Sequence, residues 1–196
     1  MDKTDTASPT VLLESVLLTS IIDAKEGRDV AIVDIPNAFV QTEMDGEEVV
    51  HMKMRSKLAE ILVQVSPEIY RDFVSIENGK KVLYVRLQRA LYGMLRSALL
   101  FYKKLRKDLE SQGFVVNPYD PCVANKIVNG KQLTVVWHVD DLKLSHVDSK
   151  VIDQMIEWLK KEYEDKEIGV IKPSRGKVHD YLAMILDFSV PGEVKI

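Results

Sequence analysis

The chain of 196 residues carries 27 basic and 30 acidic side chains, so its net charge of −3 gives no overall positive field to attract nucleic acid. Hydrophobic residues make up 46%, enough for a substantial core, and no run of about 18 apolar residues predicts a membrane span. The single cysteine, Cys122, excludes an internal disulfide framework and a cysteine-based zinc site, which fits an intracellular compartment. We expect one domain over residues 8–196 after a disordered tail at 1–7.

The first predicted elements are a helix and a strand. Ser8 and Pro9 predict the helix start, with serine as the N-cap and proline at the first helical position. Apolar residues follow at helical spacing until Gly27, which ends the helix. Residues 29–34 are apolar between two acids and predict a short buried strand.

The next segment predicts a strand, a helix and a hairpin. Residues 48–54 alternate weakly, as a strand does, and residues 57–65 carry apolar side chains at helical spacing. The dipeptide Asn78-Gly79 favours a tight hairpin turn, so residues 73–76 and 82–87 are expected to pair.

A long amphipathic helix is predicted from Leu91 to Leu109, with its end at Gly113. A second hairpin turn at Asn129-Gly130 is expected to join residues 122–128 to residues 132–138.

The last part of the chain predicts one more helix and an alternating segment. Either Asp148 or Ser149 is expected to cap the helix, and residues 177–190 alternate again. The whole pattern predicts an α+β fold with antiparallel strand pairs and two or three helices packed on one face of the sheet.

Two adjacent acids, Asp140 and Asp141, interrupt an apolar strand that restarts at once over residues 142–145. This pattern predicts a β-hairpin with carboxylates at its tip. Two unpaired acids beside apolar strands repel each other unless a cation holds them, which suggests a divalent metal. A solvated acidic turn is the more common explanation of an isolated Asp-Asp pair.

Asp34 closes a buried strand in the same way as Asp140 does. Two strands that each deliver an acid to one end of a sheet can place three carboxylates around two Mg²⁺ ions, which activate a 3′-hydroxyl and stabilise a leaving pyrophosphate. This chemistry requires Asp34 to lie within about a nanometre of the acidic pair. The alternative is that the acids are structural and unrelated.

Five motifs in sequence resemble the reverse transcriptases of copia-type LTR retrotransposons. Their order and spacing agree over roughly residues 8–190. The motifs are Asp34-Ile35-Pro36-Asn37-Ala38-Phe39, Leu91-Tyr92-Gly93 followed by Ser97-Ala98 and Phe101-Tyr102, Asp120-Pro121-Cys122, His138-Val139-Asp140-Asp141, and His179-Asp180-Tyr181-Leu182-Ala183-Met184.

The resemblance implies a palm-type antiparallel sheet with part of the fingers, and RNA- or DNA-templated addition of deoxynucleotides to a primer. By this resemblance Asp34, Asp140 and Asp141 are the catalytic acids. They are also expected to ligate two Mg²⁺ ions together with the carbonyl of Ile35, and Mn²⁺ is an expected substitute.

The resemblance also implies substrate contacts. Phe39 is the expected steric gate against a ribose 2′-hydroxyl, although it also fits a core position. Tyr92 and Gly93 are expected beside the nascent base pair, with helix-start packing as the alternative for Tyr92.

Contacts with template or primer are expected from His138, Arg96 and Lys103. His138 stands where the family has an aromatic residue, and a structural histidine is the common alternative. For the basic residues of the long helix, pairing with Asp108 and Glu110 on a solvated face is the favoured alternative.

The chain departs from the family pattern in several respects. Ala183 replaces a glycine of the last motif. We expect the N-terminal finger strands with their triphosphate-binding lysine and arginine, the thumb and connection, and the RNase H to be absent. The rival hypothesis is therefore a catalytically inactive remnant that binds nucleic acid or protein. The expected location is cytoplasmic, or alternatively a virus-like particle or the nucleus, with template–primer and deoxynucleotides as partners and no membrane.

Overall fold

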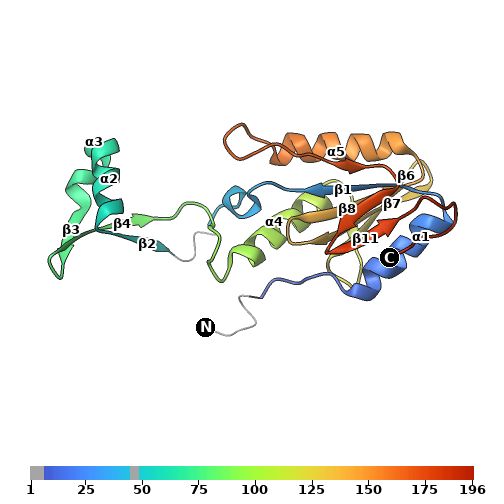
Figure 1. Cartoon of the computed structure of the whole chain (residues 1–196), viewed down its shortest axis with the longest axis horizontal. Coiled ribbons are helices and arrows are strands. Elements are labelled where there is room, and N and C mark those ends of the chain that lie inside the picture. The colour runs from blue at the N-terminus through green and yellow to red at the C-terminus, as the bar shows by residue number, and fades with distance from the viewer. Residues whose placement is uncertain (1–6, 45–48) are drawn as a thin grey trace. The chain divides into compact units, whose positions relative to one another are not determined.

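The computed structural model describes residues 7–44 and 49–196 (Figure 1). The chain forms two compact units, one from residues 1–42 and 91–196 and the other from residues 43–90. The expectation of one domain over residues 8–196 stays a prediction, and the expected tail at 1–7 lies outside the described residues except for Ala7. None of the described helices is long and apolar enough to cross a bilayer.

The larger unit is built on a six-stranded sheet in which every strand pair is antiparallel. The predicted strand at 29–34 and the hairpin at Asn129-Gly130 are confirmed, and both turn residues have the positive φ angles that such a turn requires. The spatial order is β5 (Val115–Val116), β6 (Val123–Val128), β7 (Lys131–His138), β8 (Asp141–His146), β1 (Asp29–Asp34) and β9 (Ser174–Arg175).

Two helices cover one face of this sheet, α4 (Ser97–Ser111) and α5 (Ser149–Tyr163). Their apolar side chains form the main core with those of β1, β6, β7 and β8. Asp148 caps α5, as predicted, by accepting a hydrogen bond from the N–H of Lys150 at 3.0 Å. The prediction that α4 starts at Leu91 was wrong, because Gly93 has φ +90° and a left-handed residue cannot belong to a right-handed helix.

The opposite face is covered by α1 (Leu13–Lys25) and by a hairpin of β10 (Val178–Tyr181) and β11 (Met184–Asp187). The expectation that the helices pack on one face therefore needs correction: α4 and α5 share a face and α1 lies on the other. The α+β class and the antiparallel pairing are as predicted.

The prediction that Ser8 caps α1 was also wrong, since the N-cap is Leu12. The N–H of Leu12 donates instead to Oδ2 of Asp120 at 3.0 Å, and the other carboxylate oxygen of Asp120 accepts from the N–H of Cys122 at 2.9 Å. Asp120 is buried, so it fixes the entry to α1 from a loop 108 residues away. The predicted end is confirmed, because α1 stops at Lys25 and Gly27 follows with φ +61°.

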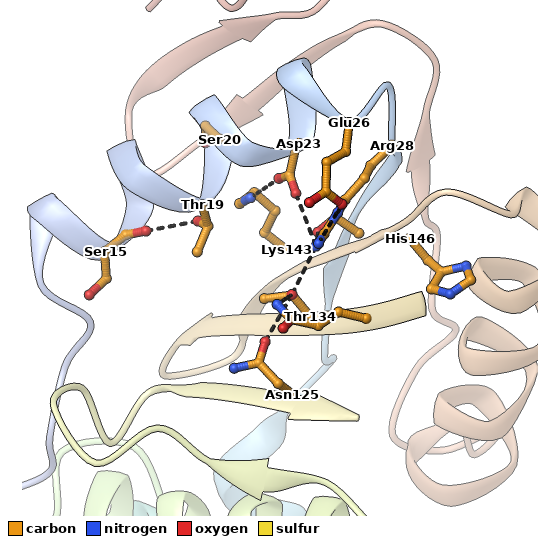
Figure 2. A network of polar contacts seen from close by, with 12 residues as sticks. Ser15, Thr19, Ser20, Asp23, Glu26, Arg28, Asn125, Thr134, Lys143 and His146 are labelled. Carbon is orange, nitrogen blue, oxygen red and sulfur yellow. Dashed lines mark hydrogen bonds and ion pairs between the residues drawn. The ribbon is translucent and has the colours of Figure 1, made fainter. Parts of the chain in front are cut away.

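A buried polar network joins α1 to the sheet (Figure 2). The Nζ of Lys143, on β8, donates to Oδ2 of Asp23, and both side chains are fully buried. Arg28 places Nη1 at 3.7 Å from Oδ1 of Asp23 and donates to Oγ1 of Thr134 at 3.0 Å. Thr134 in turn donates to Oδ1 of Asn125 at 2.9 Å. The network therefore runs from α1 across the strands to β6.

The smaller unit is a three-stranded antiparallel sheet in the order β2 (His51–Arg55), β4 (Lys80–Arg86) and β3 (Val74–Glu77). Helix α2 (Lys57–Val65) follows β2, and the short α3 (Pro67–Tyr70) follows α2. The predicted hairpin at Asn78-Gly79 and the helix at 57–65 are confirmed. The predicted strand at 48–54 is found from residue 51 on, while residue 48 lies outside the described residues.

We expect Asp23→Ala to destabilise the protein by about 3–5 kcal/mol, because it leaves the Lys143 ammonium buried without its carboxylate. Urea unfolding followed by circular dichroism measures this loss. The double variant Asp23→Leu with Lys143→Met is the control and should recover most of it, since a well-packed apolar pair replaces the charges. A single variant within about 1 kcal/mol of the parent would contradict the buried pair.

A candidate active site at the turn between two strands

The predicted acidic hairpin is formed by β7 and β8. His138 pairs with Asp141, which leaves Val139 and Asp140 as the two residues of the turn. Val139 has φ +58°, a left-handed conformation that costs a β-branched residue of order 1–3 kcal/mol. The turn therefore presents Asp140 at its tip at the expense of backbone strain.

Strand β1 brings Asp34 to this turn. Asp34 is the register partner of Asp141, so their Cα atoms lie opposite each other, typically about 4.5–5.5 Å apart. One residue further, the N–H of Ile35 donates to the carbonyl oxygen of Asp140 at 3.0 Å. The backbone thus gathers the three acids that the sequence singled out at one end of the sheet.

The pKa shifts of the acids show that their charges interact. Partial burial, and then the charge of Asp140, raise the pKa of Asp34 above its ordinary value. Burial also raises the pKa of Asp141, to which Asp140 and Asp34 contribute, while His138 opposes the shift. The ionised acids therefore repel one another in the folded chain, as expected of a site that can accept a cation.

Two aromatic rings lie beside the acids. Phe39 belongs to the short 3₁₀ helix η2 (Ala38–Gln41), and its ring centroid is 4.5 Å from that of Tyr92. Burial raises the pKa of Tyr92, and the charges of Asp140 and Asp34 add to the shift, so its hydroxyl senses both acids. Phe39 also contacts Phe101 of the core, with ring centroids 6.4 Å apart, so its ring is held on two sides.

Gly93 follows Tyr92 with φ +90°, and a Cβ atom there would meet nothing within 4 Å. The glycine is therefore required by its backbone conformation, and the space beside it is open. A close approach to Gly93 by another molecule is sterically allowed.

The residues expected to contact nucleic acid lie at separate places. His138 is half-buried at the end of β7, Arg96 is the half-buried N-cap residue of α4, and Lys103 is exposed on α4. Two further basic residues of α4 form the intrahelical ion pairs that the sequence favoured. These pairs are Lys104–Asp108 at 2.6 Å and Arg106–Glu110 at 2.8 Å.

The acids supply hard oxygen ligands, which suit Mg²⁺. Across residues 7–44 and 49–196, however, no three or more His, Cys, Asp or Glu side chains are gathered closely enough to hold a metal ion. Magnesium is commonly held by one or two carboxylates, with water and substrate phosphates completing its shell. The donor chemistry of Asp34 and Asp140 fits such a partial site, and the strand pairing that brings Asp34 to the turn favours it.

No role was predicted for Tyr181, whose hydroxyl donates to the carbonyl oxygens of Val136, at 3.3 Å, and of Asp141, at 3.5 Å. This buried side chain ties the β10–β11 hairpin to the strands that carry the turn. In the sequence, the place of Tyr181 in the last motif was the only indication of such a role. Ala183, in the turn of that hairpin, is exposed with φ +61°, so its departure from glycine strains the backbone without crowding a neighbour.

Comparison with known proteins agrees with the motifs. The model of the family described as reverse transcriptase (RNA-dependent DNA polymerase) matches residues 1–180. The chain therefore belongs to the reverse transcriptase family.

A curated relative points to the copia-type branch of this family. The chain is 24% identical over 163 residues to the "Retrovirus-related Pol polyprotein from transposon TNT 1-94" of Nicotiana tabacum. The alignment covers 83% of this chain and 11% of that protein, so the chain spans only a small part of the relative's length.

We expect Asp34→Asn to raise the melting temperature at pH 7, because it removes a partly buried charge that Asp140 also repels. The pKa values of Asp34 and Asp141 are raised in the folded chain. These carboxyls therefore contribute to stability at pH values below their pKa in the unfolded chain. That contribution to stability is lost as the pH rises through their pKa values in the folded chain. Solvent screening limits the increase in the free energy of unfolding to about 1 kcal/mol, which corresponds to a rise in melting temperature of roughly 2–4 °C.

Differential scanning fluorimetry between about pH 3 and pH 8 measures this effect, and the difference should vanish near pH 3, where the carboxyls are protonated. Asp180→Asn, at an exposed position on β10, is the control and should leave the melting temperature unchanged. An Asp34→Asn variant that is less stable than the parent at pH 7 would contradict the repulsion.

Proposed function

We propose that this chain carries the polymerase site of a copia-type retrotransposon reverse transcriptase, which adds deoxynucleotides to a primer on an RNA or DNA template. The single observation that supports this most is the register of β1 on β8, which pairs Asp34 with Asp141. Bound Mg²⁺ would neutralise phosphate charge and favour ionisation of the primer 3′-hydroxyl. Asp34 and Asp140 would hold it, with the Ile35 carbonyl as a further ligand.

In the proposed reaction the 3′ oxygen of the primer forms a bond to the α-phosphorus of the deoxynucleotide. The bond from that phosphorus to the β,γ-diphosphate breaks, pyrophosphate leaves with the electron pair, and the hydroxyl proton passes to solvent. Asp141, as the companion acid, would lie nearest the primer end. Burial, and then the charges of Asp140 and Asp34, raise the pKa of Asp141.

Substrate selection would rest on the aromatic pair. The ring of Phe39 is held between Tyr92 and Phe101 and would occupy the space that a ribose 2′-hydroxyl needs. Tyr92 and the open space at Gly93 would adjoin the new base pair. His138, Arg96 and Lys103 are the proposed contacts to template and primer, and the proposed location is cytoplasmic.

One observation favours the second candidate, an inactive chain that binds nucleic acid or protein. No three metal-ligating side chains converge in the part of the chain that the structure describes. In the first candidate the acids are needed for primer extension. In the second they have no catalytic role.

Primer extension on an RNA template with Mg²⁺ or Mn²⁺ tests the proposal. The parent chain should extend a primer, and Asp140→Asn should reduce extension at least about a thousandfold, because the variant lacks a carboxylate that would hold the Mg²⁺ needed to stabilise charge in the transition state. Asp180→Asn is the matched control and should keep the parent rate. Extension that survives Asp140→Asn would overturn the catalytic assignment.

A binding measurement separates the candidates if extension is not detected. Salt-dependent retention of labelled template–primer with no extension by the parent would favour the binding module. Mg²⁺ provides a second readout. Mg²⁺ should raise the melting temperature of the parent. If Asp34 holds the ion, Mg²⁺ should leave the melting temperature of Asp34→Asn unchanged.

We expect Phe39→Val to admit ribonucleotides, since a smaller side chain opens the space that the aromatic ring fills. The ratio of ribonucleotide to deoxynucleotide incorporation should rise by about tenfold or more, measured in parallel single-nucleotide extensions. Phe188→Val, which alters a buried ring in the other core cluster, is the control. An unchanged ratio in Phe39→Val would refute the steric-gate role.

A further inference from the structure

Helix α1 carries apolar residues on its outward face as well as on the face that packs against the sheet. Its inward face carries the buried apolar residues Val16 and Ala24 and the buried polar residues Ser20 and Asp23. Asp23 pairs with Lys143 beneath the helix (Figure 2). Its outward face carries apolar residues, with Leu18 59% and Ile21 49% exposed. Surface helices normally place their apolar stripe against the core, so this outward stripe lacks the cover that such residues usually have.

The exposed stripe has the spacing of a helix-pairing seam. Glu14, Leu18, Ile21 and Lys25 follow one another at intervals of four, three and four residues, and all four are exposed. This is the alternation with which two helices pack side chains into each other along a coiled-coil seam. The apolar residues occupy the middle of the stripe and the two charged residues occupy its ends.

The charges on this seam are self-complementary. When two copies of α1 pair in antiparallel orientation about a two-fold axis between residues 19 and 20, Leu18 of each meets Ile21 of the other. The same register places each Glu14 opposite the other copy's Lys25. Within the described residues neither of these two side chains forms an ion pair in its own chain.

We propose that α1 is a homodimerisation surface and that its occupant is a second copy of this chain, paired antiparallel through Leu18 and Ile21. The β10–β11 hairpin carries further exposed apolar residues. This hairpin covers the same side of the sheet as α1, and its outward residues Val178 and Ile185 are 53% and 60% exposed. A seam of this length fits a weak, reversible dimer rather than an obligate one.

Sedimentation equilibrium of the 196-residue chain tests the pairing. The parent should dimerise with a dissociation constant of tens of micromolar, roughly, and Leu18→Glu should raise that constant at least about tenfold. Val170→Glu is the matched control, because Val170 is 57% exposed in the loop after α5. This variant should leave the dissociation constant unchanged. Both substituted positions are exposed, and circular dichroism checks that each variant stays folded.

A charge exchange tests the orientation. Glu14→Lys should weaken the homodimer, as should Lys25→Glu, because each places like charges opposite each other at both ends. The double variant should restore the parent constant, and an equimolar mixture of the two single variants should form a heterodimer in preference to either homodimer.

A monomer at all concentrations up to about 0.5 mM would overturn the proposal and leave the face to a different partner. Association that Leu18→Glu does not weaken would overturn it as well, and would point to another surface, such as the edge strand β5. Failure of the double charge variant to restore the parent constant would exclude the antiparallel register.

Discussion

The buried ion pair between Lys143 and Asp23 is the constraint on which the larger unit depends. Lys143 lies in the middle of β8, between Leu142 and Leu144, which face the main core with α4 and α5. A slip of one residue would turn the ammonium into that apolar core. The pair therefore fixes which side of β8 faces α1. With β8 facing this way, its observed register on β1 places Asp34 opposite Asp141.

The same pair explains the character of α1. A charge at the centre of a sheet face is tolerated only if the element above it brings a partner, so α1 must turn Asp23 inward. Val16, Ser20 and Ala24 share this inner face, and the apolar residues at positions 18 and 21 point outward. The unusual surface of α1 is thus a consequence of how its inner face is held.

The elements that could be predicted from the sequence are those set by local chemistry. Asn78-Gly79 and Asn129-Gly130 determine their turns with their own backbone conformations, and Asp148 caps α5 through a neighbour two residues away. The convergence of Asp34 with the acidic pair was also predictable, because both strands end in an acid at the same edge of the sheet.

What the sequence did not reveal depends on distant partners. The start of α1 was missed because Asp120 binds the N–H of Leu12 from 108 residues away. The alternation around Lys143 is typical of a strand with one solvated face, and only the packing of α1 shows that this face is buried. The contact of Tyr181 with the carbonyl oxygen of Asp141 spans 40 residues and leaves no local pattern.

The turn between β7 and β8 is costly to maintain. Val139 holds a left-handed conformation, and partial burial, followed by the charge of Asp140, raises the pKa values of Asp34 and Asp141. The hydrogen bonds from Ile35 and Tyr181 hold the turn in place against this cost, but a glycine and a neutral side chain would form a hairpin with less strain. Strain and repulsion that bring no structural benefit are characteristic of sites shaped by a reaction. On this physical ground the turn supports the polymerase proposal over the binding-module alternative, since binding to phosphates would gain nothing from acidic residues at this turn.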